Sequence, residues 1–323
     1  MGVINQDTGQ LNKLIGRYEY PLLEYWTAKF EDGLKSSMIP EFFDMIQSSN
    51  AFEAIGELTG TPTFREWAGE FTYGEVSEGN SKVFTPVVWE AGRAFDRFTL
   101  SNAKLLDLKT QVDKFNTEAL RLRENICAGM FSNAASTSFV INGKTITNTT
   151  ADGLALASAS HVGSGTYTTT QSNYGTSALT PDNLEAAIQA MFDYKDDDGN
   201  YCNLQPDTLV VPTYLRGTAL EIIGGPGKYN TANNNPNIYY GSMKLIVWPQ
   251  FRKLSGATGY PWFVMDSVAA KQSLKHINRL ESGDMMDIQS WKDYETQTWK
   301  LGAIMWFVVG AFDWRPFYIQ IPA

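Results

Sequence analysis

The most regular pattern of apolar positions lies between residues 101 and 131. Apolar side chains recur there at alternating steps of four and three residues, at Leu108, Val112, Phe115, Ala119, Leu122 and Ile126. This spacing places them on one face of an α-helix. Ser101 is suited to cap the helix, and no glycine or proline interrupts residues 93–128. A helix of about 30 residues is about 45 Å long, so the pattern predicts a spine helix in an elongated domain.

The first 57 residues contain large apolar side chains separated by residues that break helices. The apolar residues include Tyr25, Trp26, Phe42 and Phe43, and the breakers are Gly16, Pro21, Gly33 and Pro40. Proline removes a helical hydrogen bond, and glycine weakens a helix. The pattern therefore predicts an extended or helix-broken arm. Such an arm has to bury its aromatic side chains either on its own domain or on a neighbouring subunit.

Two strands are predicted within residues 62–98. The first strand contains the aromatic residues Phe64, Trp67, Phe71 and Tyr73. A turn is predicted at residues 77–81, and a return strand at residues 82–89. Pro86 cannot donate to a central ladder, so the hairpin has a free edge and is predicted to project. A two-stranded ribbon is marginally stable alone, so this charged hairpin is either solvated or held by a partner.

Residues 132–180 are rich in serine and threonine, and only Lys144 and Asp152 among them are charged. This composition is typical of surface loops with short strands. Asn142-Gly143 predicts a hairpin turn after a strand at residues 139–141. A loop of this length is uncommon inside a compact domain, so we expect the region to be exposed or functional.

The remaining residues predict a second lobe that mixes helices and strands. We expect helices at residues 181–192 and 214–223, and strands at residues 208–211, 244–248, 262–265 and 301–321. Residues 224–237 are rich in glycine and asparagine and predict a mobile loop.

Composition excludes some classes of protein. Hydrophobic residues make up 43% of the 323-residue chain, which is enough for a folded core. A net charge of −9 argues against sequence-independent nucleic-acid binding, which depends on Lys and Arg. The longest strongly apolar stretch, residues 301–312, is shorter than the about 20 residues that span a membrane. Cys127 and Cys202 form no disulfide framework and are typical of buried thiols in a reducing compartment.

No combination of residues predicts catalysis, a cofactor or a metal. His161 and His276 lie far apart, and no HExxH, GxSxG or P-loop motif occurs. Residues 193–200 fail as a calcium loop because its first and last ligand positions fall on Tyr194 and Gln205; they predict a solvated acidic turn. Nine tryptophans and fifteen tyrosines without a site favour assembly, since aromatic side chains are enriched at interfaces.

Three strings, in this order, resemble those of the Mu-like prophage major head subunit, a tailed-phage major capsid protein. They are Phe64-Arg65-Glu66-Trp67 with Gly69-Glu70, Asp152-Gly153-Leu154-Ala155-Leu156 leading to Ser160-His161, and Leu204-Gln205-Pro206-Asp207-Thr208-Leu209-Val210-Val211-Pro212. The order of arm, charged hairpin, spine helix and mixed lobe is also similar to that of tailed-phage major capsid proteins. The resemblance covers residues 50–265.

This resemblance implies an α+β fold, the phage major-capsid fold, in five parts. They are an N-terminal arm (1–57), an extended hairpin loop (58–98), a peripheral domain (99–180) with the spine helix at 101–131, an axial domain (181–290), and C-terminal strands (291–323) that return to its sheets. Contacts between subunits are then expected at Arg65, Glu66, Trp67, Glu70, Lys82, Trp89, Tyr25, Trp26, Phe42 and Phe43. Deleting the arm would leave a folded protein that fails to assemble.

The resemblance also implies partners. Copies of the chain would form pentamers and hexamers of an icosahedral virion shell, assembled in the host bacterial cytoplasm around double-stranded DNA that it does not bind specifically. A separate scaffolding protein is expected, because no large charged helical segment follows Met1. A portal and, optionally, a decoration protein are also expected, but no membrane, cofactor or enzymatic activity. Two alternatives stay open: an encapsulin-like protein compartment, and an intracellular hydrolase with an unrecognised site.

Overall fold

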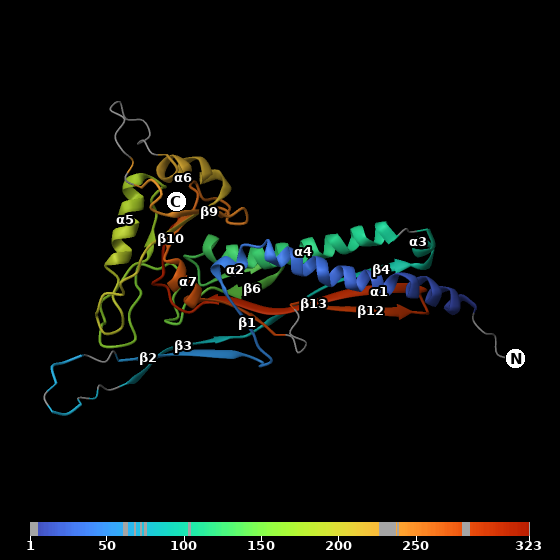
Figure 1. The fold of residues 1–323 in the computed structure, drawn as a ribbon, viewed down its shortest axis with the longest axis horizontal. Helices are drawn as coiled ribbons and strands as arrows, with labels where there is room; N and C mark the ends of the chain where they lie inside the picture. Colours follow the sequence, from blue (N-terminus) through green and yellow to red (C-terminus); the bar gives the residue numbers. More distant parts are fainter. Residues whose placement is uncertain are drawn as a thin grey trace.

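The computed structural model describes residues 6–60, 64–67, 69–71, 73, 76–102, 105–225, 237, 239–279 and 285–322. The molecule is elongated (Figure 1). Two long helices lie along a sheet at one end, a lobe of shorter elements forms the other end, and a two-stranded ribbon projects beyond the lobe. The loop expected at residues 224–237 falls mostly outside the described residues.

Two five-stranded sheets organise the fold. The long sheet consists of β1 (Asp44–Gln47), β11 (Leu274–Asn278), β13 (Thr298–Ala311), β12 (Asp287–Asp293) and β4 (Val87–Asp96). The lobe sheet has the order β7 (Tyr174–Gly175), β14 (Phe317–Gln320), β10 (Trp262–Met265), β8 (Thr208–Val211) and β9 (Lys244–Val247). Two separate pairs are β2 (Glu53–Thr59) with β3 (Ser77–Phe84) and β5 (Ser138–Ile141) with β6 (Lys144–Thr147). The helices are α1 (Gln6–Lys35), α2 (Ile39–Phe42), α3 (Arg97–Asn102), α4 (Leu105–Ser132), α5 (Pro181–Phe192), the 3₁₀ turn η1 (Thr213–Leu215), α6 (Arg216–Ile223) and α7 (Ser267–Ser273).

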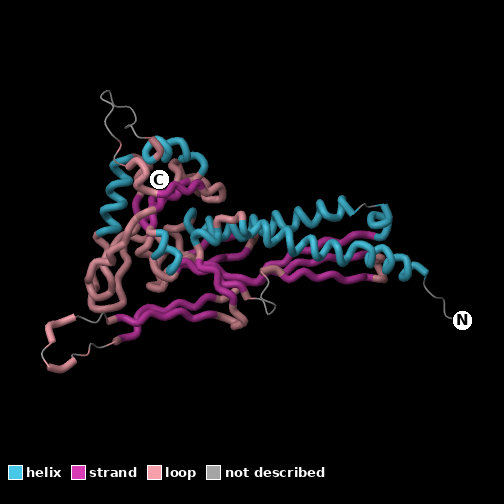
Figure 2. The backbone as a smooth tube through the Cα atoms, in the orientation of Figure 1, coloured by secondary structure: helices cyan, strands magenta, loops and turns pink. Residues whose placement is uncertain are grey.

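The N-terminal segment forms one long helix, α1, beside α4 (Figures 1 and 2). Leu22, Trp26 and Phe30 follow one another at steps of four residues and are all buried, as on one face of a helix. The Trp26 ring lies 4.8 Å from that of Phe115 in α4. The expected helix-broken arm is therefore wrong for α1. Pro21 removes one backbone hydrogen bond, and burial of the apolar face offsets that loss.

The predicted spine helix is confirmed as α4. Its apolar face is buried at Leu108, Val112, Phe115, Ala119 and Ile126 and partly buried at Leu122. Ser101, expected as the cap, instead lies in the short helix α3, where its hydroxyl donates to the Phe98 carbonyl at 2.8 Å. The spine helix therefore starts later than the expected capping residue.

β13 is the central strand of the long sheet. It pairs with β4 along one edge, and with β12 and then β11 along the other. Every second side chain from Trp299 to Ala311 is buried, as expected for a strand with one face against the core. β11 lies within the range expected for the axial lobe but pairs in the long sheet, because the partner of a strand is chosen in three dimensions rather than by its own residues.

The lobe forms as its sequence predicts. The Thr180 hydroxyl accepts a hydrogen bond from the Asn183 N–H, and Pro181 occupies the first turn of α5. All four positions of β8 and of β10 are buried. Leu184, Leu209 and other buried side chains form a hydrophobic cluster separate from that under the long helices. The helices and strands expected between residues 181 and 265 are confirmed.

The serine- and threonine-rich region has a confirmed hairpin and an unexpected interior. Asn142 (φ 49°) and Gly143 (φ 80°) join β5 to β6, as a tight hairpin turn requires. Beyond β6, however, Asn148, His161 and Asn173 are fully or almost fully buried. The Asn148 amide donates to the carbonyl of Met130 at 3.0 Å. The region is therefore only partly surface, because its polar side chains satisfy buried backbone carbonyls.

Glu124 of α4 joins three parts of the fold. Its carboxylate accepts hydrogen bonds from the Ser37 hydroxyl (2.5 Å), the Met38 N–H (2.9 Å) and the Trp248 indole N–H (2.9 Å). We expect Glu124→Leu to lower the free energy of unfolding by about 3 kcal/mol, because buried donors lose their acceptor. Urea denaturation measures this loss, with Glu118→Leu, an exposed position of the same helix, as the control. Equal losses in both variants would contradict the role of the carboxylate.

Candidate assembly surfaces

The projecting ribbon consists of β2 and β3, which pair antiparallel. Its first strand lies at residues 53–59 rather than between residues 62 and 73, and residues 77–81, expected as a turn, belong to β3. A Cβ at Gly79 would lie 2.9 Å from the Thr59 methyl and 3.1 Å from the Ser164 hydroxyl. Glycine therefore serves here for a close approach of the chain, not for a turn.

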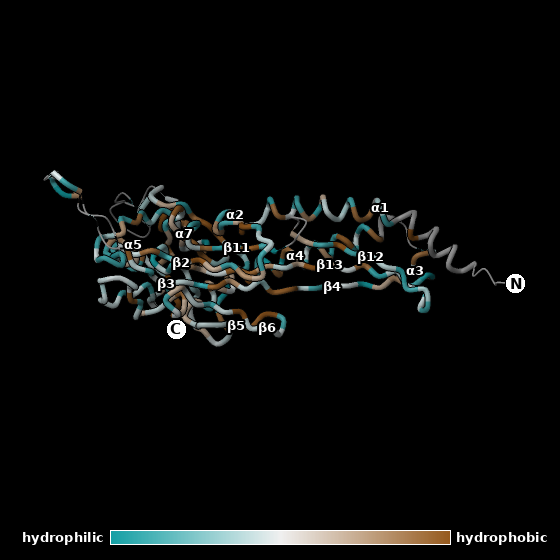
Figure 3. Tube along the Cα trace, turned by 90° about the horizontal axis from the view of Figure 1, so that it is seen from below, coloured by the Kyte–Doolittle hydropathy of each residue, from teal (hydrophilic) through white to brown (hydrophobic). Residues whose placement is uncertain are grey.

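The loop between β2 and β3 forms the tip of the ribbon, here the described residues among 64–73. The large side chains of the tip are 63–101% exposed, at Phe64, Trp67, Phe71 and Tyr73. The Trp67 and Phe71 rings meet edge to face at 5.1 Å, and Arg65, Glu66 and Glu70 are exposed beside them. The tip lies away from the body in two perpendicular views (Figures 1 and 3). An exposed aromatic group of this kind marks an interaction surface.

Where the ribbon meets the body, Lys82 and Trp89 contact their own chain. The Lys82 ammonium donates to the carbonyl oxygens of Thr149 and Ala311, the latter at 2.9 Å. Burial lowers the pKa of Lys82 to about 8. The Trp89 ring is half-buried, 6.4 Å from the Phe307 ring. These two residues anchor the start of the long sheet and the ribbon.

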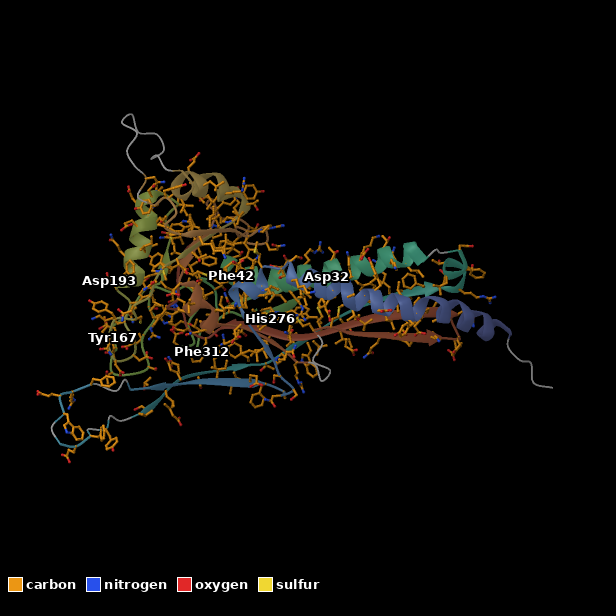
Figure 4. The ribbon with its side chains drawn as sticks, viewed as in Figure 1. Asp32, Phe42, Tyr167, Asp193, His276 and Phe312 are labelled. Atoms are coloured by element: carbon orange, nitrogen blue, oxygen red, sulfur yellow. The ribbon has the colours of Figure 1, made fainter. Side chains whose placement is uncertain are left out.

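The four residues predicted in the arm lie within the chain's own fold. Trp26, Phe42 and Phe43 are at most 1% exposed. Phe42 lies where the lobe meets the long helices (Figure 4), stacked 4.8 Å from the Trp248 ring. Tyr25 is half-buried, and its hydroxyl donates to Asp113 at 2.8 Å, which raises the pKa of the tyrosine. Of the ten predicted contact residues, those of the tip are thus the ones that reach away from the body.

A charged group at the inner end of the ribbon was not anticipated. We call it the base cluster: Glu57 of β2 with Asp197, Asp313 and Arg315. Arg315 Nη2 lies 2.7 Å from Asp197 Oδ1, and Nη1 lies 3.3 Å from Asp313 Oδ1. Asp197 is 7% exposed, so residues 193–200 are not a fully solvated turn. No local pattern could reveal the cluster, because its members come from three distant segments.

The structure places the remaining chemistry-bearing residues in structural positions. His161 Nδ1 lies 2.5 Å from Asp152 Oδ2, and its ring stacks on Trp314 at 4.4 Å. His276 is buried and stacks on Phe307 at 5.2 Å. Within the described residues, no group of three or more His, Cys, Asp or Glu side chains is arranged to hold a metal ion. In the same part of the chain, no helix has the length and apolarity needed to cross a membrane.

Solved structures share the arrangement of spine helix, long sheet, lobe and ribbon. The PhiM1 mature capsid matches with 13% identity over 87% of this chain and 85% of that chain, with a TM-score of 0.54. Mycobacterium phage Patience matches with 11% identity over 97% and 88%, with a TM-score of 0.56. The capsid of the native GTA particle gives 9% identity over 89% and 90%, with a TM-score of 0.52. At these identities the likeness shows a shared fold.

The sequence itself matches a family model described as phage capsid protein over residues 82–320. No curated protein matches the chain significantly. The family match spans most of the chain and includes the spine helix, the lobe and both sheets. The chain therefore belongs to the phage capsid protein family, and it is a major capsid protein of a tailed phage.

Proposed function

We propose that copies of this chain form pentamers and hexamers of a closed icosahedral shell around double-stranded DNA, and that the ribbon tip contacts a neighbouring copy. One observation supports this contact above others. Four large aromatic side chains are exposed together at the end of a ribbon whose other end is anchored. Exposed apolar surface of this kind is stabilised by burial in an interface, and repeated identical contacts close into symmetric assemblies.

Specific tip residues follow from this geometry. Trp67 supplies apolar area, while Arg65, Glu66 and Glu70 offer charges that can orient the contact. Aromatic side chains and arginine dominate the energy of protein interfaces, and charged groups mainly set orientation and rate of association. Individually weak contacts suffice, because each subunit makes many of them at once.

The finer assignments belong to the same proposal. The long sheet with α1 and α4 corresponds to a peripheral domain, and the lobe with α5 and α6 to an axial domain that meets its copies around the symmetry axes. The Mu-like subtype is supported by the three sequence strings, two of which lie within the family match. A separate scaffolding protein, a portal and an optional decoration protein would complete the head in the bacterial cytoplasm. The net charge of −9 suits a wall that does not grip the enclosed DNA.

Negative-stain electron microscopy and sedimentation of the purified protein test the proposal. We expect closed shells, or sheets of hexameric capsomers, either from the protein alone or after co-expression with the neighbouring head genes. DNA in shells made during infection would separate a phage head from a compartment that encloses protein cargo. Monomers in both expression contexts would contradict the proposal.

A further inference from the structure

The base cluster joins the ribbon to the lobe through more acidic groups than basic ones. Glu57 of β2, Asp197 of the turn after α5 and Asp313 of the β13–β14 connection surround one guanidinium group, that of Arg315. Glu57 shares a hydrogen bond with the carboxyl group of Asp197. With all four groups ionised, three negative charges would face one positive charge in a partly buried site. Such an arrangement is unfavourable unless one carboxyl group holds a proton.

Ribbon and lobe are packed closely around this hydrogen bond. The Asp197 carboxylate accepts from the Ser164 N–H at 3.0 Å, and its carbonyl accepts from the Tyr167 N–H at 2.9 Å. The Ser164 hydroxyl in turn lies 3.1 Å from where a Cβ on Gly79 of β3 would be. Tyr167 marks this end of the lobe, next to the ribbon, in Figure 4. Glu57 and Asp197 have little room to move apart while the ribbon stays docked.

A hydrogen bond between two carboxyl groups requires a proton on one of them, because ionised carboxylates only accept. We propose that this shared proton is a latch for the ribbon. While Glu57 is protonated, it holds β2 on the lobe through Asp197. When the proton is lost, the two carboxylates repel each other and the inner end of the ribbon is released.

The direction of the pH dependence follows from the pKa of Glu57. Burial, together with the carboxylates of Asp197 and Asp313, raises this pKa from 4.5 to about 7, against the opposing effect of Arg315. A raised pKa in the docked state means that docking is strongest below the pKa of the released state. Docking is then lost progressively as the pH rises from about 4.5 through about 7.

The other charged groups at this contact do not reproduce that dependence. The pKa of Arg315 is raised further by Asp313 and Asp197, so it stays a cation. The Lys195 ammonium lies over the rings of Tyr167 and Tyr201. On the ribbon, the pKa of Lys82 is about 8, so its charge is nearly constant below about pH 7. Glu57 is the group of this contact that changes its charge within the window.

Hydrogen–deuterium exchange of the full-length unassembled protein tests the latch between about pH 5 and about pH 7.5. After correction for the intrinsic pH dependence of exchange, we expect amides of β2 and β3 to exchange roughly tenfold to a hundredfold faster at the higher pH, because one unit of pKa is tenfold in equilibrium and solvent screens a half-buried group. Amides of α4 should show no such change. Since the latch acts within one chain, this result does not depend on shell assembly.

Glu57→Gln and Glu78→Gln form a matched pair of variants. Glutamine imitates the protonated acid, so Glu57→Gln should keep the ribbon protected at both pH values. Glu78 is exposed on the same ribbon, and Glu78→Gln should behave as the unchanged protein. The latch is overturned if exchange in the unchanged protein has no pH dependence at the ribbon, a result that needs no variant to fold. It is equally overturned if Glu57→Gln retains the full dependence.

Discussion

Trp67→Ala combined with Glu70→Arg is expected to raise the protein concentration needed for shell assembly at least about tenfold, while the melting temperature of the unassembled protein stays unchanged. Trp67 is 63% exposed and its ring meets only the Phe71 ring of the same tip. Substitutions at such a surface usually change stability by less than about 0.5 kcal/mol. Loss of a central aromatic anchor in an interface costs about 2 kcal/mol or more, and every 1.4 kcal/mol is tenfold in affinity.

Light scattering against protein concentration measures assembly, and calorimetry of the unassembled protein measures the melting temperature. Trp67→Phe with Glu70 unchanged is the matched control, because it keeps an aromatic ring at the tip and should assemble almost normally. A fall in melting temperature that matched the loss of assembly would place the tip in the core. Normal assembly of the double variant would mean that the tip makes no contact between subunits.

Trp26→Ala should destabilise the chain itself, by about 3 kcal/mol. The side chain is fully buried, against the ring of Phe115, and replacing a buried tryptophan by alanine costs about 3–5 kcal/mol. Its indole N–H has no hydrogen-bond partner among the described residues. Alanine therefore also removes an unpaired buried donor, which places the loss at the lower end of that range. Urea denaturation measures it, and the melting temperature should fall by roughly 5–10 °C.

Tyr20→Ala is the control for this substitution, because Tyr20 lies in the same helix and is 77% exposed. It should leave stability nearly unchanged. If Trp26→Ala kept its stability and lost assembly, α1 would pack on a neighbouring copy after all. The same reasoning changes the expectation for a larger deletion. Removing residues 1–57 is expected to prevent folding, because Leu22, Phe42 and other core side chains would be lost with it.

Elements whose signals are local were predictable from the sequence. α4 was recognised because six apolar residues repeat at helical spacing without interruption, and its packing kept that face buried. The β5–β6 hairpin followed from Asn142-Gly143, whose backbone conformation is a property of those two residues. The strands β8 and β10 were likewise recognised from short apolar runs that are buried at every position.

Predictions failed where a distant contact outweighed a local preference. Pro21 disfavours a helix, yet α1 continues through it because its apolar face is buried on α4. Gly79 suggests a turn, yet it lies in a strand because the lobe approaches too closely for a side chain. In both cases the decisive atoms are far away in the sequence, so no pattern around the residue could reveal them.

The amino-acid pattern was sufficient to establish the spine helix, the mixed lobe, a charged projecting hairpin and the resemblance to phage capsid proteins. Periodicity, turn residues and short motifs are all read within a few neighbouring positions. It could not separate the exposed tip residues from the buried aromatic side chains of the N-terminal segment, since both groups are equally apolar. Nor could it bring Glu57 together with Asp197, Asp313 and Arg315. Burial and charge clustering depend on which distant segments meet in space, and that depends on how the whole chain packs.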